Sequence, residues 1–121
     1  MNLDYAVERL YEGGWTPTSD IGMDLERLPD GRTFPSVPAV QREFERGGLH
    51  LSIEHNLKFH CYRATWAPVG EPVDPAQRIE DARHGTVIAS CEREAAVYAL
   101  AQLRAAQADI TQHLQHSMAM A

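Results

Sequence analysis

Apolar side chains recur at helical spacing in the first segment of the chain. Leu3, Val7 and Leu10 share one helical stripe, and a pair of glycines directly after Glu12 is a typical stop signal. The pattern therefore predicts a first helix over residues 3–12.

A second helix is predicted to begin after Ser36, whose hydroxyl can accept a hydrogen bond from the free N–H groups at a helix start. Val40 and Phe44 share one face of this helix, and another pair of glycines ends it. The intervening segment, residues 15–35, has a looser pattern. Its Pro-Asp-Gly turn at 29–31 predicts a short strand or an irregular hairpin.

Apolar and polar side chains alternate in the centre of the chain, which is typical of strands with one buried face. Leu49, Leu51 and Ile53 alternate with polar residues, and residues 58–66 repeat the pattern with several aromatic side chains. A third strand is predicted over residues 85–89.

The register of the first two strands depends on the turn that joins them. A two-residue turn at 56–57 places Ile53 opposite His60 on an apolar face. The same register places His50 beside Arg63 on the other face, which is more polar. We expect this polar face to be either solvated or a contact surface.

The longest helix is predicted to begin after Ser90, a suitable N-cap, and two glutamates follow in its first turn, where they complement the helix dipole. Its apolar stripe consists of Ala96, Leu100, Leu103, Ile110 and Leu114. This helix is longer than a small sheet needs, so its C-terminal half is a candidate contact for a homodimer. A short helix is also expected over residues 75–83.

These elements predict an α+β protein that forms a single domain over residues 1–121. A three-stranded antiparallel sheet with helices packed on one face forms an αβββα-like core over residues 36–114. An N-terminal helix and a short strand or hairpin precede it in an acidic segment, residues 1–35. The tail, residues 115–121, is expected to fray.

The core elements follow the order helix, strand, strand, strand, helix, and the last of them carries Ala95-Ala96, Ala99-Leu100 and Leu103. This order and this alanine-rich helix resemble the double-stranded-RNA-binding domain over about residues 36–108. The resemblance implies that both helices pack on one face of a three-stranded antiparallel sheet.

In that family, RNA binding depends on a cluster of lysines at the start of the final helix. The corresponding positions here are Cys91 and Glu92 when the serine is aligned, and Ile88 and Ala89 when the alanines are aligned. A carboxylate at Glu92 would repel phosphate. The resemblance therefore extends to the fold but not to the basic motif that contacts RNA in that family. Nucleic acid is for this reason not the expected partner.

Composition and charge narrow the classes of function. The 121 residues are 44% apolar and 23% charged, which is typical of a globular protein, and the formal net charge is −6. That balance argues against a general polyanion binder. Seven acidic and only two basic side chains lie in residues 1–30, so this segment is the candidate electrostatic contact.

Neither a membrane segment nor an export signal is recognisable. No apolar run approaches the roughly 20 residues of a membrane helix, and the N-terminus lacks a basic region followed by an apolar stretch. Two cysteines are too few for a disulfide scaffold, which fits a reducing compartment. We therefore expect a cytoplasmic protein without a membrane partner.

The sequence predicts no catalytic residue, no cofactor and no metal site. Cys91 is the better nucleophile candidate because the start of a helix favours a thiolate, but Glu92 and Glu94 oppose it. The histidines do not gather at metal-ligand spacing, and the glycines form no phosphate-binding loop.

The pattern therefore favours a small soluble non-enzymatic protein that binds another macromolecule. The expected partner is another protein, for example one with a basic surface, and this chain would act on it as an inhibitor or a regulatory adaptor. Two alternatives remain open: an RNA-binding domain with relocated contacts, and a small enzyme that uses Cys91 or a histidine. The candidate interaction surface combines the acidic N-terminal segment with the open sheet face: Asp4, Glu8, Glu12, Trp15, Asp20, Asp24, His50, Arg63, Trp66 and Tyr98.

Overall fold

The computed structural model describes residues 2–17, 24–70 and 83–119, with side chains up to Gln107. The predicted helix over 75–83 falls almost entirely outside these residues. The elements follow in the order α1 (Leu3–Glu12), β1 (Leu25–Arg27), β2 (Thr33–Pro35), α2 (Val37–Arg46), β3 (Leu49–Asn56), β4 (Cys61–Pro68), β5 (Gly85–Ala89) and α3 (Glu92–Ala119). The predicted α+β class is confirmed, and so are the first helix, the hairpin and the third strand.

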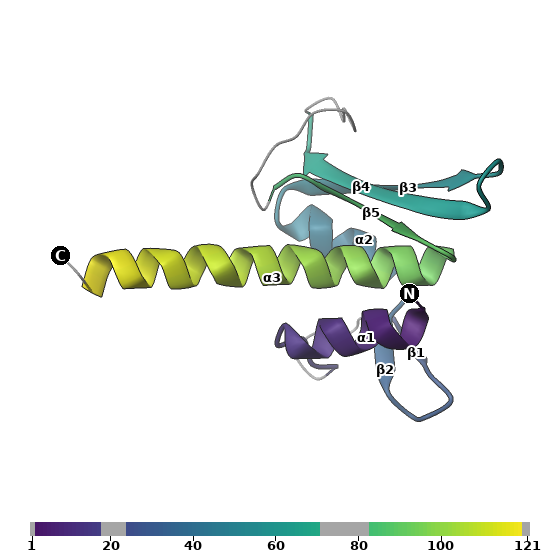
Figure 1. The fold of residues 1–121 in the computed structure, drawn as a ribbon, viewed down its shortest axis with the longest axis horizontal. Coiled ribbons are helices and arrows are strands. Elements are labelled where there is room, and N and C mark those ends of the chain that lie inside the picture. Colours follow the sequence, from purple (N-terminus) through teal and green to yellow (C-terminus); the bar gives the residue numbers. More distant parts are fainter. Residues whose placement is uncertain (1, 18–23, 71–82, 120–121) are drawn as a thin grey trace.

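Three layers are stacked along the molecule (Figure 1). The antiparallel sheet, in the strand order β3-β4-β5, lies on one side of α3, and α2 packs against both α3 and β3 beneath the same face. The helix α1 and the β1-β2 hairpin lie on the opposite side of α3. No described helix covers the other face of the sheet, which we call the outer face.

The central position of α3 explains its many small residues. A helix with neighbours on two sides must bury most of its circumference, and alanine allows backbones to approach closely. The segment 94–101 is accordingly buried at every position except Tyr98. Its contacts with α1 on one side and with the sheet on the other join the layers into one core.

The N-cap of α3 differs from the prediction. The helix begins at Glu92, so Cys91 occupies the cap position, and its Sγ accepts a hydrogen bond from the Glu94 N–H at 3.4 Å. Ser90 stands one residue earlier, where its N–H and its hydroxyl both donate to the Glu94 carboxylate. Cys91 Sγ thus accepts the helix N–H that we expected the Ser90 hydroxyl to accept, and the Glu94 carboxylate holds Ser90 from inside the first turn.

The predicted register of β3 and β4 is wrong because their connection is longer than two residues. Residues 57–60 form the turn, and Ile53 lies opposite Ala64, not opposite His60. His50 consequently lies opposite Ala67, while Arg63 lies opposite Glu54. The β4 residue opposite each β3 residue lies four positions further along the chain than predicted. Because four is an even number, each strand residue stays on its predicted face of the sheet.

The helix α3 extends to Ala119, and in Figure 1 its C-terminal half projects beyond the sheet and beyond α1. The homodimer contact remains a prediction because Ile110 and Leu114 lie beyond Gln107, the last residue with a described side chain. The fraying of the tail also remains a prediction. Among the described residues, no helix combines the length and the apolar character that a bilayer crossing requires.

Candidate functional site

Both tryptophans of the candidate surface belong to the core. Trp15 is 3% exposed and packs against Tyr11 at a ring-centroid distance of 5.5 Å, while Trp66 is 5% exposed and packs against Phe44 at 5.5 Å. Both side chains are members of the single hydrophobic core cluster. Their predicted role as interface anchors is therefore corrected: they fill the interior of the free protein.

Tyr98 does not join the predicted patch with His50 and Arg63. Its ring lies 6.1 Å from that of Tyr5, so Tyr98 faces α1. His50 and Arg63 are on the sheet, whose outer face points away from α1. The three side chains are thus divided between two sides of the molecule.

The acidic N-terminal segment is largely paired within the chain. Three of its carboxylates reach arginines on other elements, and two more pair with nearby arginines. The pairs are Asp4 with Arg32 at 3.8 Å, Asp24 with Arg42 at 3.2 Å, Glu26 with Arg93 at 3.0 Å, Glu12 with Arg9 at 2.9 Å and Asp30 with Arg32 at 2.8 Å. Exposed pairs of this kind contribute little stability, but they lower the net negative charge that this surface presents.

Two candidate acids are left over. Glu8 is exposed and forms no ion pair within the described residues, and Asp20 lies outside them. Within the described residues, the acidic segment that we predicted as the electrostatic contact therefore presents mostly carboxylates that are already paired with arginines.

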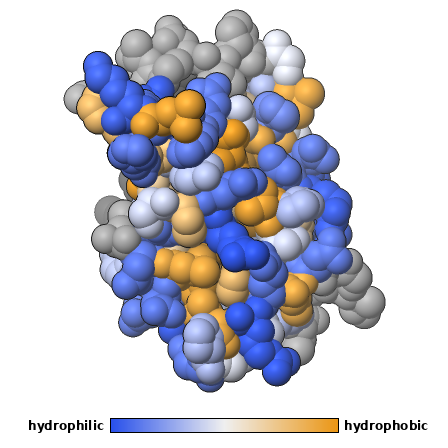
Figure 2. Space-filling model, turned by 90° about the vertical axis from the view of Figure 1, so that its right-hand side faces the viewer, coloured by the Kyte–Doolittle hydropathy of each residue, from blue (hydrophilic) through white to orange (hydrophobic). Residues whose placement is uncertain are grey.

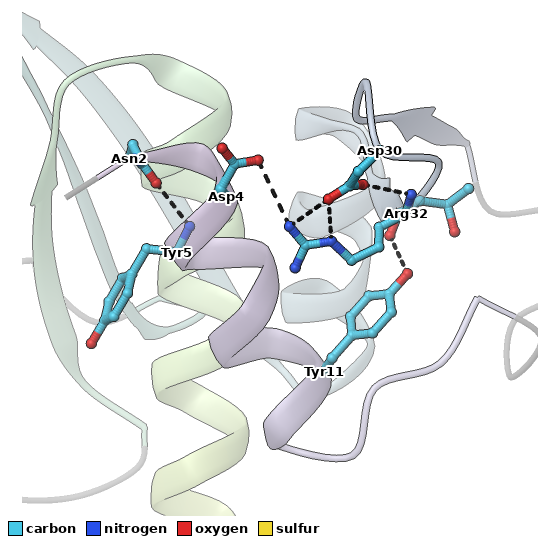
Figure 3. Close-up of polar contacts among 7 residues, drawn as sticks. Asn2, Asp4, Tyr5, Tyr11, Asp30 and Arg32 are labelled. Carbon is cyan, nitrogen blue, oxygen red and sulfur yellow. Dashed lines mark hydrogen bonds and ion pairs between the residues drawn. The ribbon is translucent and has the colours of Figure 1, made fainter.

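A polar cluster ties the β1-β2 turn to α1 (Figure 3). Asp30 accepts hydrogen bonds from the Arg32 backbone N–H at 2.9 Å and from its guanidinium Nε at 2.8 Å, and the same guanidinium faces Asp4. On the other side of the turn, the Tyr11 hydroxyl donates to the Thr33 carbonyl at 2.6 Å. The hydrogen bonds from Arg32 lower the pKa of Asp30 and raise that of Arg32.

We expect the Asp30 carboxyl to titrate below its ordinary value of 3.8, because the Arg32 guanidinium stabilises its charged form. The stability contributed by the pair is then present in full above about pH 3.8 and is lost as the pH falls through the lowered pKa of the folded state. Carboxyl ¹³C NMR during an acid titration measures this midpoint. Arg32→Gln should move it back towards 3.8 and Arg42→Gln should leave it unchanged, whereas a wild-type midpoint at or above 3.8 would contradict the pair.

The outer face of the sheet is a surface that the described helices leave open. Alternate residues of the three strands form it: His50, Ser52, Glu54, Asn56, Cys61, Arg63, Thr65, Ala67, Thr86 and Ile88. Most of these side chains are polar, but Ile88 is 54% exposed. Of the predicted surface residues, His50 and Arg63 are the two that the structure places here.

The turn between β3 and β4, which we call the hairpin tip (residues 57–60), is shaped by Asn56. Its Oδ1 accepts hydrogen bonds from the N–H groups of Lys58 at 3.1 Å and Phe59 at 3.2 Å, and His60 closes the turn with a positive φ of 51°. This turn leaves Leu57 73% exposed and Phe59 67% exposed. Figure 2, which views this end of the molecule, shows hydrophobic side chains among hydrophilic ones near the edge that the sheet occupies.

A shallow groove of about 310 Å³ joins the hairpin tip to the outer face. Leu57 and Ile88 supply its apolar lining, and Glu54 and Arg63 supply its charges. Our sequence prediction missed the two apolar residues. Because Val87 is buried, the alternation of β5 would have placed Ile88 on the outer face. The exposure of Leu57 depends on the four-residue turn at 57–60, for which the sequence pattern predicted a turn of only two residues.

A second groove, of about 410 Å³, lies where the N-termini of α2 and α3 meet, and Cys91 lines it together with Ser36 and Arg93. Cys61 lies on the outer face, so the two free cysteines belong to different surfaces. Within the described residues, no three metal-ligating side chains come together. A reaction at Cys91 stays a prediction.

Comparison with protein-family models, curated proteins and solved structures found no match for this chain. The resemblance to the double-stranded-RNA-binding domain therefore stays a prediction. The geometry of the described residues carries the functional inferences that follow.

Proposed function

We propose that this protein is a protein–protein interaction module, acting as an inhibitor or a regulatory adaptor, and that it binds its partner through the outer face and the hairpin tip. The observation that carries the proposal is the concentration of exposed apolar side chains at one end of an open sheet face: Leu57, Phe59 and Ile88. A small apolar patch within a polar surround is the usual composition of a specific protein interface.

The scaffold beneath this surface is suited to binding without rearrangement. Three hydrogen-bonded strands hold the outer face, and Trp66 and Phe44 pack under the sheet from β4 and α2. A preformed surface loses little conformational entropy when it binds. The acidic N-terminal segment, in contrast, already satisfies most of its charges with arginines of the same chain.

The RNA-binding alternative has less support. Glu92 is exposed at the start of α3, where the resembling family carries lysines, and Glu94 is fully buried beside it. A gel shift with duplex RNA at low salt tests this alternative directly. A shift at micromolar protein would favour it over a protein partner.

Affinity purification from the native host with matched variants tests the proposed function. Wild-type protein and the Glu8→Lys variant should recover the same stoichiometric partner, because Glu8 lies on α1, away from the sheet. Ile88→Glu should lose it, because this substitution replaces an exposed apolar side chain of the groove with a charged one. Recovery of no stoichiometric partner by wild-type protein at any salt concentration would contradict the proposal. If only the Glu8→Lys variant failed to recover the partner, the interface would lie on α1 and not on the sheet.

A further inference from the structure

We infer that the groove beside the hairpin tip recognises a protein segment in which a carboxylate stands next to an apolar side chain, an inference that rests on the proposed function. In this arrangement Arg63 binds the carboxylate, and Leu57 and Ile88 bind the apolar side chain. All three residues line the same groove of about 310 Å³.

Arg63 differs from five of the nine described arginines because it forms no ion pair within the described residues. Arg9, Arg32, Arg42, Arg46 and Arg93 each form an ion pair. Glu54 lies directly opposite Arg63 on β3, yet no ion pair joins the two in the described structure. Arg63 is partly buried as a residue, and its guanidinium, which pairs with no described side chain, is available for a bidentate contact with a carboxylate.

The charge around the groove favours an acidic partner. The hairpin of β3 and β4, residues 49–68, contains Lys58, Arg63 and three of the six histidines, against Glu54 as its single acid. The other residues of the chain contain nine basic and sixteen acidic side chains. With histidine counted as neutral, the hairpin has a formal charge of +1 and the rest of the chain −7, so charge complementarity favours a segment that carries negative charge at the hairpin.

The apolar lining selects a protein over a nucleic acid. Leu57 is 73% exposed and Ile88 is 54% exposed, and a phosphate backbone offers nothing that would remove such side chains from water. An acidic and apolar peptide segment satisfies both the guanidinium and the apolar lining at once. Phe59, which is 67% exposed, is a further apolar side chain of the hairpin tip.

A random ten-residue peptide library, displayed on phage and selected on the full chain, tests this chemistry. We expect the selected peptides to share an aspartate or glutamate within two positions of a leucine, isoleucine or phenylalanine. The most enriched peptide is then labelled with fluorescein, and its affinity is measured by fluorescence polarisation against wild-type protein and four variants.

The four variants separate the parts of the site. Arg63→Gln and Ile88→Ser should each weaken binding about tenfold or more, since a charge-assisted hydrogen bond and a buried side chain are lost. Glu54→Gln should strengthen it about threefold by removing the acid of the hairpin. Arg27→Gln, at an exposed arginine of β1 that also lacks an ion pair in the described structure, should leave binding unchanged.

Several results would overturn the inference. They are a library that enriches no acidic and apolar motif, a selected peptide whose affinity survives Arg63→Gln, or a 20-base-pair RNA duplex whose binding depends on Arg63. Circular dichroism of each variant shows whether lost binding reflects a lost fold. The proposed function fails separately, when wild-type protein recovers no partner from its host.

Discussion

Gly85→Ala should lower the midpoint of thermal unfolding by about 10 °C. Gly85 lies opposite Trp66 in the ladder between β4 and β5, and a Cβ at this position would overlap Cζ2, Cη2 and Cε2 of the indole. Trp66 is 5% exposed and its indole packs against the Phe44 ring, so the indole must be displaced within the core to accommodate the new Cβ. Overpacking of this kind costs about 2–3 kcal/mol, and about 4 °C accompanies each kcal/mol in a domain of this size.

Two further variants make the Gly85→Ala result specific, with unfolding followed by circular dichroism. Gly47→Ala is the matched control, because its Cβ would meet its nearest atom at an ordinary 3.6 Å and its φ is −87°. We expect its stability to change by less than about 1 kcal/mol. In a Trp66→Leu background, Gly85→Ala should cost about 1–2 kcal/mol less than in the wild type. An unfolding midpoint of Gly85→Ala equal to that of wild type would contradict the close packing.

Local signals accounted for the elements of the fold. The two N-terminal helices end at glycines as predicted, the Ser36 hydroxyl caps α2 at 3.3 Å from the Ala39 N–H, and β5 has the predicted bounds. The predicted turn between β3 and β4 was wrong because Asn56 accepts two backbone hydrogen bonds and thereby lengthens it. The alternation of apolar and polar residues does not reveal that the Asn56 side chain hydrogen-bonds to the backbone of its own turn.

The candidate site was less predictable, because it depends on contacts between distant segments. The pair of Glu26 with Arg93 joins residues 67 positions apart, and no local pattern shows that the acidic segment is compensated in this way. The tryptophans were ambiguous between core and interface for the same reason: a large amphipathic ring serves a core and an interface equally well. Only packing decides between them, and packing placed Trp15 and Trp66 inside.

Phe44→Ala should destabilise the protein by about 3–5 kcal/mol, the largest effect that we expect from a single substitution. Phe44 is 0% exposed, and its ring packs at 5.5 Å from Trp66, so it joins α2 to the sheet that carries the outer face. Phe59→Ala is the matched control, since the same change at a side chain 67% exposed should cost less than about 1 kcal/mol. Urea denaturation measures both.

The Phe44→Ala and Gly85→Ala substitutions should not be additive, because both act through the Trp66 indole. Removal of the Phe44 ring opens space beside that indole, into which it can move when Gly85 gains a Cβ. We therefore expect the double variant to be about 1 kcal/mol more stable than the sum of the two single effects predicts. Strict additivity would mean that the indole cannot shift towards α2. In that case the strain of Gly85→Ala must be relieved within β5, and it would then reach Ile88 on the outer face.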